Sequence, residues 1–129
     1  MANIPEDLSY SKDHEWLRRD GDRATIGITD YAQRQLGDIV YIELPKEGER
    51  FEAGEPFGNV ESVKAVSEVY LPVTGTVLTV NASLADEPEQ VNTDPYGDGW
   101  LLTIQLSGST EALLTAAEYE EYLREETSD

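Results

Sequence analysis

The residue with the clearest capacity for chemistry is Lys64, because it stands alone in a long acidic stretch. The preceding basic residue is Arg50 and the following one is Arg124, and thirteen acidic residues lie between those two arginines. A lysine amine can attack a substrate, form a Schiff base or be acylated by another enzyme. A single lysine is more often ordinary surface, so its surroundings have to distinguish these cases.

The segment around Lys64 predicts a β-hairpin with the lysine at its tip. Residues 57–63 and 66–72 are both rich in valine and typical of strands. Lys-Ala differs from the Asn-Gly pairs that tight hairpin turns favour, so we expect a type I turn. We take Lys64 and Ala65 as the turn, which pairs Val63 with Val66, Ser62 with Ser67, and Glu61 with Glu68.

The predicted neighbours of Lys64 favour modification of its amine over catalysis by it. Carboxylates at Glu61 and Glu68 favour the charged ammonium, whereas a Schiff-base or nucleophilic lysine needs the neutral amine. Acylation by a separate enzyme fits this setting. The two glutamates themselves have two open interpretations. They are solvent-screened surface, or they mark a docking place for the modifying enzyme or contact a cation on the modified side chain.

Composition excludes several classes of site. There is no cysteine and only one histidine, His14, so thiolate chemistry and multi-histidine metal sites are ruled out. The net charge of -18 argues against nucleic acid and against anionic membrane surfaces. It suits basic protein partners, although a solvated acidic surface is the simpler explanation. We expect no membrane span and no signal peptide, and hence a cytoplasmic bacterial protein.

Short apolar segments between glycine and proline turns predict a mainly β fold, a sandwich or small barrel. A short helix should begin after Thr29 and end at Gly37, and Asn81 should start a single helical turn. Thr115 and Glu118 have the spacing of a capping box for a C-terminal helix. We expect one domain over 1–129 with frayed ends at about 1–7 and 125–129. The predicted strands are two within 10–28, then 38–44, 57–63, 66–72 and 100–106.

Several motifs occur in a fixed order along almost the whole chain, from about Leu8 to Arg124. In that order they are similar to the glycine cleavage H-protein family. The motifs are His14-Glu15-Trp16, Gly27-Ile28-Thr29-Asp30-Tyr31-Ala32, Leu36-Gly37-Asp38-Ile39-Val40, Glu43-Leu44-Pro45, Glu61-Ser62-Val63-Lys64-Ala65, Asp94-Pro95-Tyr96-Gly97-Asp98-Gly99-Trp100 and Ala116-Ala117-Glu118-Tyr119.

The resemblance implies a barrel-sandwich hybrid of two antiparallel sheets with short helices and a C-terminal helix. It implies a carrier with no catalytic residues and no metal, bearing lipoate in amide linkage on Lys64. Glu61, Ser62, Val63 and Ala65 complete the lipoylation motif. Glu15 and Glu68 would contact the loaded arm, and many relatives have aspartate at the second of these positions.

The resemblance also implies the partners. A pyridoxal-phosphate glycine decarboxylase loads an aminomethyl group, and an aminomethyltransferase passes it to tetrahydrofolate. Dihydrolipoamide dehydrogenase reoxidises the dithiol, and lipoate- or octanoyl-transferring enzymes attach the arm. Tethering would deliver the carried group at high effective concentration.

Other functions compete with this interpretation. Another swinging-arm carrier is disfavoured, because related lipoyl domains centre on Asp-Lys-Ala and biotin carriers on Met-Lys-Met. An H-protein that relays lipoate to other enzymes stays open. An enzyme would have to use His14 with Glu15, or Glu61 with Glu68, and nothing in the sequence surrounds either pair with a nucleophile or metal cluster. An interaction module with an unmodified Lys64 is the last alternative.

Overall fold

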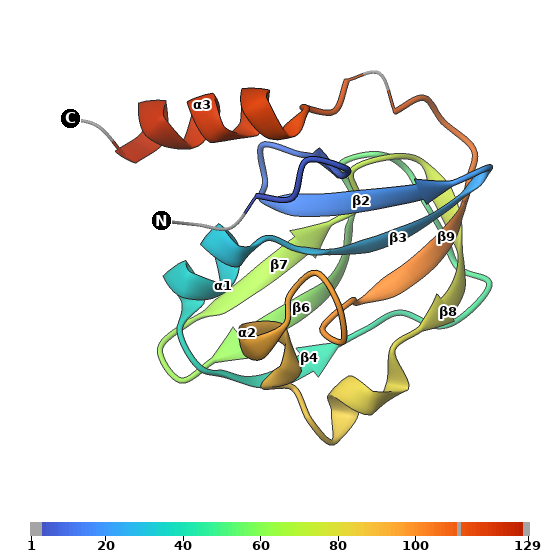
Figure 1. The fold of residues 1–129 in the computed structure, drawn as a ribbon. Helices are drawn as coiled ribbons and strands as arrows, with labels where there is room; N and C mark the ends of the chain where they lie inside the picture. The colour runs from blue at the N-terminus through green and yellow to red at the C-terminus, as the bar shows by residue number, and fades with distance from the viewer. Residues whose placement is uncertain (1–3, 111, 128–129) are drawn as a thin grey trace.

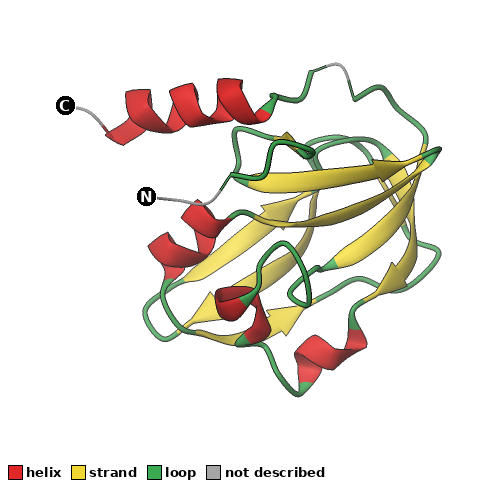
Figure 2. Cartoon of the chain, in the orientation of Figure 1, coloured by secondary structure: helices red, strands yellow, loops and turns green. Residues whose placement is uncertain are grey.

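The chain folds into two antiparallel sheets with short helices at their edges, as predicted (Figure 1, Figure 2). The computed structural model describes residues 4–110 and 112–127. A six-stranded sheet has the order β1-β2-β3-β9-β8-β5, and a three-stranded sheet has the order β4-β6-β7. The strands of the larger sheet are β1 (Ser9–Tyr10), β2 (Glu15–Asp20), β3 (Arg23–Ile28), β5 (Arg50–Phe51), β8 (Gly75–Val80) and β9 (Leu102–Leu106).

The three-stranded sheet carries the lysine hairpin. Its strands are β4 (Ile39–Glu43), β6 (Pro56–Ser62) and β7 (Val66–Tyr70). The helices are α1 (Asp30–Leu36), η1 (Ala82–Ala85), α2 (Gln90–Thr93) and α3 (Ala116–Thr127). No helix in the described ranges is long and apolar enough to cross a membrane.

The core lies between the inner faces of the two sheets. Val60 and Val69 of the small sheet belong to the same buried cluster as Ile26 and Ile104 of the large one. Each fully buried side chain of this type contributes about 1.5–3 kcal/mol relative to its exposed state. The alternation of apolar and polar residues along β6 and β7 therefore gives the small sheet one buried and one solvent-facing side.

A second buried cluster attaches helix α3 to strands β1 and β2. The rings of Tyr10 and Tyr119 stack with centroids 4.7 Å apart and an interplanar angle of 5°. Trp16 is fully buried in the same cluster and lies across Gly27, where a Cβ atom would come within 2.6 Å of the indole. Glycine at position 27 therefore makes room for the tryptophan.

The predicted helix signals are confirmed. Thr29 Oγ1 accepts a hydrogen bond from the Ala32 N–H, and Gly37 follows the last residue of α1 with φ of 83°. Thr115 and Glu118 form the reciprocal capping box, and η1 follows Asn81.

Helix α3 ends at Thr127, within the range 125–129 where we expect fraying, and that fraying stays a prediction. Residues 4–7 are also described, and the Pro5 carbonyl accepts a hydrogen bond from the Tyr10 hydroxyl at 2.6 Å. The remaining parts of the predicted frayed ends, residues 1–3 and 128–129, lie outside the described residues.

Candidate functional site

The turn that carries Lys64 lies one residue earlier than predicted. The Ser62 N–H donates to the Ala65 carbonyl at 2.8 Å, so Val63 and Lys64 are the two central turn residues. In the resulting register Glu61 faces Val66, Val60 faces Ser67, and Asn59 faces Glu68. The predicted direct pairing of Glu61 with Glu68 is therefore wrong.

The Ser62 side chain explains the shift. Its Oγ accepts from the backbone N–H groups of Lys64 at 3.3 Å and Ala65 at 3.1 Å. A serine hydroxyl that satisfies the N–H groups two and three residues later stabilises a turn immediately after it. The prediction that Lys64 and Ala65 form the turn left out this hydroxyl, which is the local signal for a turn one residue earlier.

The turn rests on the loop between α1 and β4. The Val63 N–H donates to the Asp38 carbonyl at 3.0 Å. The side-chain stem of Lys64 passes close to Gly37, where a Cβ atom would lie 3.5 Å from Cε of the lysine. Lys64 itself is exposed, so a fixed backbone presents a solvent-accessible amine.

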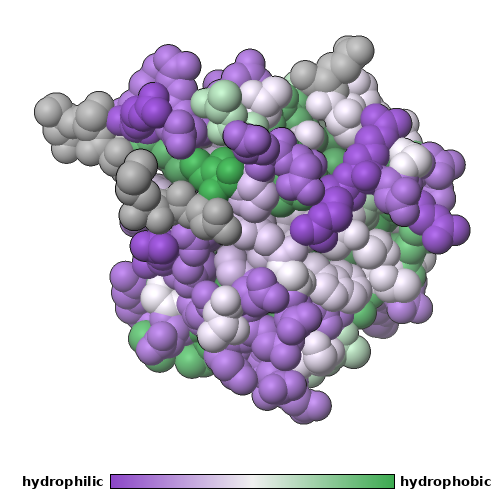
Figure 3. Space-filling view, in the orientation of Figure 1, coloured by the Kyte–Doolittle hydropathy of each residue, from purple (hydrophilic) through white to green (hydrophobic). Residues whose placement is uncertain are grey.

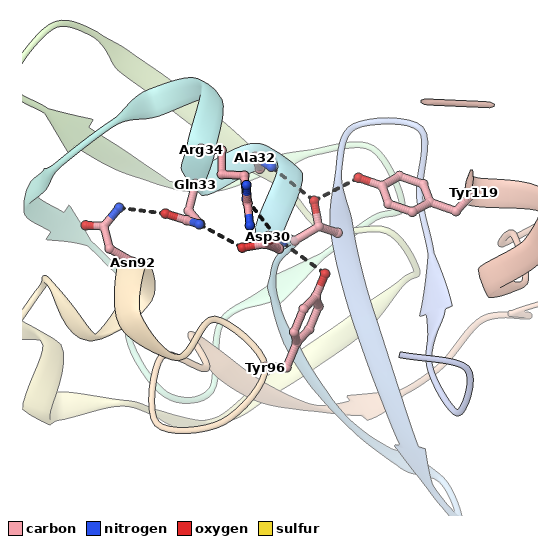
Figure 4. Close-up of polar contacts among 8 residues, drawn as sticks. Asp30, Ala32, Gln33, Arg34, Asn92, Tyr96 and Tyr119 are labelled. Atoms are coloured by element: carbon pink, nitrogen blue, oxygen red, sulfur yellow. Dashed lines mark hydrogen bonds and ion pairs between the residues drawn. The ribbon is translucent and has the colours of Figure 1, made fainter. Parts of the chain in front are cut away.

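Asn92 of α2 fixes that supporting loop, and sequence reasoning missed it. Its Nδ2 donates to the Gly37 carbonyl and to Gln33 Oε1, both at 2.9 Å, and its Oδ1 accepts from the Ile39 N–H at 2.8 Å. Figure 4 shows Asn92 facing Gln33 of helix α1. One side chain therefore links α2, α1 and the start of β4 beneath the lysine turn.

The amino end of α1 is also held by hydrogen bonds to residues distant in the sequence (Figure 4). The hydroxyls of Thr29 and Tyr119 are 2.8 Å apart, which joins the helix cap to α3. The Asp30 N–H donates to the hydroxyl of Tyr96, whose pKa burial raises to about 12. Asp30 in turn accepts from Gln33 Nε2 at 2.8 Å. Helix α1 is thus connected at both ends to distant parts of the chain.

Glu15 is a buried carboxyl group with only 2% of its surface exposed. It accepts from the Ser11 hydroxyl at 2.6 Å and from the Tyr70 N–H at 3.2 Å. Burial raises the pKa of Glu15 to about 7, while these two hydrogen bonds oppose the rise and the charge of Asp13 adds to it. Near neutral pH this group can hold a proton or pair with a cation.

Strand β7 connects Glu15 and Glu68, because it contains Glu68 and its last residue binds Glu15. Glu15 binds the backbone at Tyr70, the last residue of β7, and the exposed Glu68 lies two residues earlier. The strand from Val66 to Tyr70 spans roughly 13 Å. Lys64 thus lies beyond one end of β7 and Glu15 at the other.

The alternative enzyme pair of His14 and Glu15 is used structurally. His14 Nδ1 lies 2.8 Å from the Tyr119 hydroxyl, and its ring packs on Tyr31 with centroids 4.7 Å apart. Among the described residues no group of three or more histidine, aspartate or glutamate side chains could hold a metal ion.

Comparison with known proteins agrees with the motifs. The family model for the glycine cleavage H-protein matches residues 8–126. The glycine cleavage system H protein of Herpetosiphon aurantiacus is 53% identical over 128 residues, which cover 99% of each chain. That of Rubrobacter xylanophilus is 57% identical over 126 residues, covering 98% of this chain and 99% of the relative.

A solved structure extends the agreement to the fold. The crystal structure of a glycine cleavage system H protein from Mycobacterium marinum superposes with a TM-score of 0.86 at 44% sequence identity. The match covers 92% of this chain and 97% of the other. The chain therefore belongs to the glycine cleavage H-protein family, the lipoyl carriers of the glycine cleavage system.

Proposed function

We propose that Lys64 is the residue that carries the lipoyl group, in amide linkage through its Nζ atom. The observation that carries the proposal is its placement as an exposed central residue of a turn that Ser62 and Asp38 hold in place. Such a tip lets an enzyme reach the amine without disturbing the sheet. Within the motif, Ser62 and Ala65 close the turn, while Val63 and Glu61 face solvent.

The residues present fit a covalent acyl arm. Lys64 is exposed, and no hydrogen bond or ion pair of its amine occurs among the described residues. Acylation therefore breaks no contact there. When bound, the lipoyl group supplies the two sulfur atoms for group and electron transfer, which a chain without cysteine cannot provide.

We further propose that Glu15 and Glu68 bind a positively charged amine at the end of the arm. The Glu15 carboxylate is buried and poorly solvated, so a cation beside it would stabilise its ionised form. Glu68 is exposed on β7, the strand whose last residue donates a hydrogen bond to Glu15, and would add a second negative charge. Burial at Glu15 would also keep water from the carried group.

In this proposal the chain itself is not catalytic. It would receive the arm from a lipoate- or octanoyl-transferring enzyme. It would then visit the pyridoxal-phosphate glycine decarboxylase, the tetrahydrofolate-dependent aminomethyltransferase and dihydrolipoamide dehydrogenase in turn.

The reconstituted glycine cleavage system tests the assignment. Lys64→Arg keeps a positive, exposed side chain that cannot form the stable amide, so we expect an unchanged melting temperature and no glycine-dependent carbon dioxide release. Lys12→Arg, the same change at another exposed lysine, should retain activity. Turnover by Lys64→Arg at the rate of the unsubstituted protein would contradict the proposal.

A further inference from the structure

The exposed large hydrophobic side chains of the described chain all gather around the lysine turn. They are Val40, Tyr41, Val63 and Val66, with 48%, 56%, 69% and 65% of their surfaces exposed. In Figure 3 hydrophobic surface is visible at the lower left, where Figure 1 shows the β6–β7 turn and the start of β4, within a largely hydrophilic face. These apolar side chains are therefore concentrated on one face of an otherwise strongly acidic protein.

Strand register explains how the patch is built. Tyr41 faces Glu61, which faces Val66, so these three form one row across the solvent-facing side of the small sheet. A bulge between Ile39 and Tyr41 leaves Val40 as an extra residue in β4. Such bulges redirect side chains, and here two consecutive apolar residues are exposed. We call Val40, Tyr41, Val63 and Val66 the apolar patch.

Glu61 lies between Tyr41 and Val66 within the apolar patch, and three further carboxylates border the patch. Asp38, Glu43, Glu61 and Glu68 are all exposed, and Glu43 and Glu68 flank Asn59 in the next row of the sheet. That row borders a hollow of about 390 Å³ whose lining includes Leu44, Phe51 and Phe57. An apolar centre within a charged rim is the usual anatomy of a protein interface.

We propose that this face is the docking surface for the enzyme that acylates Lys64, and that this enzyme presents apolar side chains within a rim of lysine and arginine. The inference rests on the proposed role of Lys64. An enzyme that acylates the bare lysine has to bring its donor to Nζ, only a lysine stem away from the backbone. It therefore cannot avoid the patch, whereas an enzyme that acts on the far end of a long arm can dock at a distance.

The charges favour the same occupant. The rim is anionic, and Lys64 is the only basic residue between Arg50 and Arg124. A basic partner would be steered to this rim, and the apolar patch would supply contacts that are buried on docking. The two features together predict an interface that weakens with salt but does not vanish.

The test is the initial rate of Lys64 acylation by a purified lipoate-attaching enzyme with its acyl donor, followed by intact mass over a range of carrier concentrations. The double variant Tyr41→Thr/Val66→Thr removes the centre of the patch and keeps residues suited to strands. We expect its KM to rise about tenfold or more with kcat within about twofold. Leu78→Thr, a half-buried change in the other sheet, is the matched control and should leave both constants unchanged.

A second readout separates docking from lysine exposure. A small water-soluble acylating ester should label Lys64 at the same rate in the unsubstituted chain and in the double variant, because the ester needs no docking surface. Raising the salt to about 0.5 M should increase the KM of the unsubstituted chain, since the rim charges are then screened. If the double variant does not fold, the single variant Tyr41→Thr and the salt series provide the test.

The outcomes are distinct. An unsubstituted chain that the enzyme does not acylate at all would contradict the proposed function. Normal acylation of the unsubstituted chain, together with an unchanged KM in the folded double variant or single variant, would overturn the docking surface and leave the role of Lys64 standing. A KM independent of salt would overturn the basic rim of the partner.

Discussion

Replacement of Glu15 by glutamine should change how the stability of the protein depends on pH. The pKa of Glu15 is about 7 in the folded protein against an ordinary value of 4.5, because the carboxyl is buried. Between these two values the folded protein keeps the proton that the unfolded chain releases. The free energy of unfolding that this group contributes therefore falls as pH rises through this window and is constant above it.

The size of the effect follows from the same two values. A pKa of about 7 in the folded protein against 4.5 in the unfolded chain corresponds to a contribution of about 3 kcal/mol to the free energy of unfolding. Of this, about 2 to 3 kcal/mol is lost between about pH 5 and about pH 8. Glutamine is neutral throughout, and its carbonyl oxygen can still accept from Ser11 or Tyr70. Glu15→Gln should thus resemble the unsubstituted protein at the lower pH and exceed it in stability at the higher one.

Urea unfolding at the two pH values measures this directly. The difference in unfolding free energy between the two proteins should grow by about 2 to 3 kcal/mol from the lower to the higher pH. Titrating groups that do not interact with Glu15 cancel in this difference. Glu47→Gln, an exposed control, should show no such growth. A Glu15→Gln difference that is the same at both pH values would refute the assignment of Glu15 as a carboxyl destabilised by burial.

Three further substitutions test the supports of the site by urea unfolding. Ser62→Ala removes the acceptor of two turn N–H groups and should cost about 1 kcal/mol; unchanged stability would contradict that role. Asn92→Ala leaves the Gly37 carbonyl and Ile39 N–H without their partner and should cost about 2–3 kcal/mol; a loss below about 0.5 kcal/mol would contradict it. Gly27→Ala forces Trp16 to move, so we expect a loss of about 1–3 kcal/mol and red-shifted tryptophan emission; an unshifted spectrum would contradict the close packing.

Local signals in the sequence predicted much of the scaffold. The helix boundaries were predicted correctly because each capping residue bonds to a group only a few positions away in the sequence. These residues are Thr29, Gly37, Thr115 and Glu118. The lysine hairpin was predicted for the same reason. Its register was wrong because the hydroxyl of Ser62, which the prediction left out, stabilises a turn one residue earlier. That the chain is a single domain stays a prediction.

The features that position the site depend on contacts between distant residues. Asn92 lies 53 residues from Ile39 along the chain, and Glu15 lies 55 residues from Tyr70. Nothing near either residue in the sequence indicates these partners. Burial of Glu15 also breaks the alternation expected of a strand, because Glu15, Trp16 and Leu17 are all buried at the start of β2. Only the packed structure shows that Glu15 is buried and that its pKa is raised.

The central claim is that Lys64 bears the lipoyl group, and the most direct test is the mass of its peptide. The protein would be produced in a host able to make and attach lipoate, digested, and mapped by mass spectrometry, with Lys64→Arg prepared in parallel. We predict a lipoyl mass increment on the peptide that contains Lys64 and no increment in the variant. A Lys64 peptide without the increment, or the same increment on another lysine, would contradict the account.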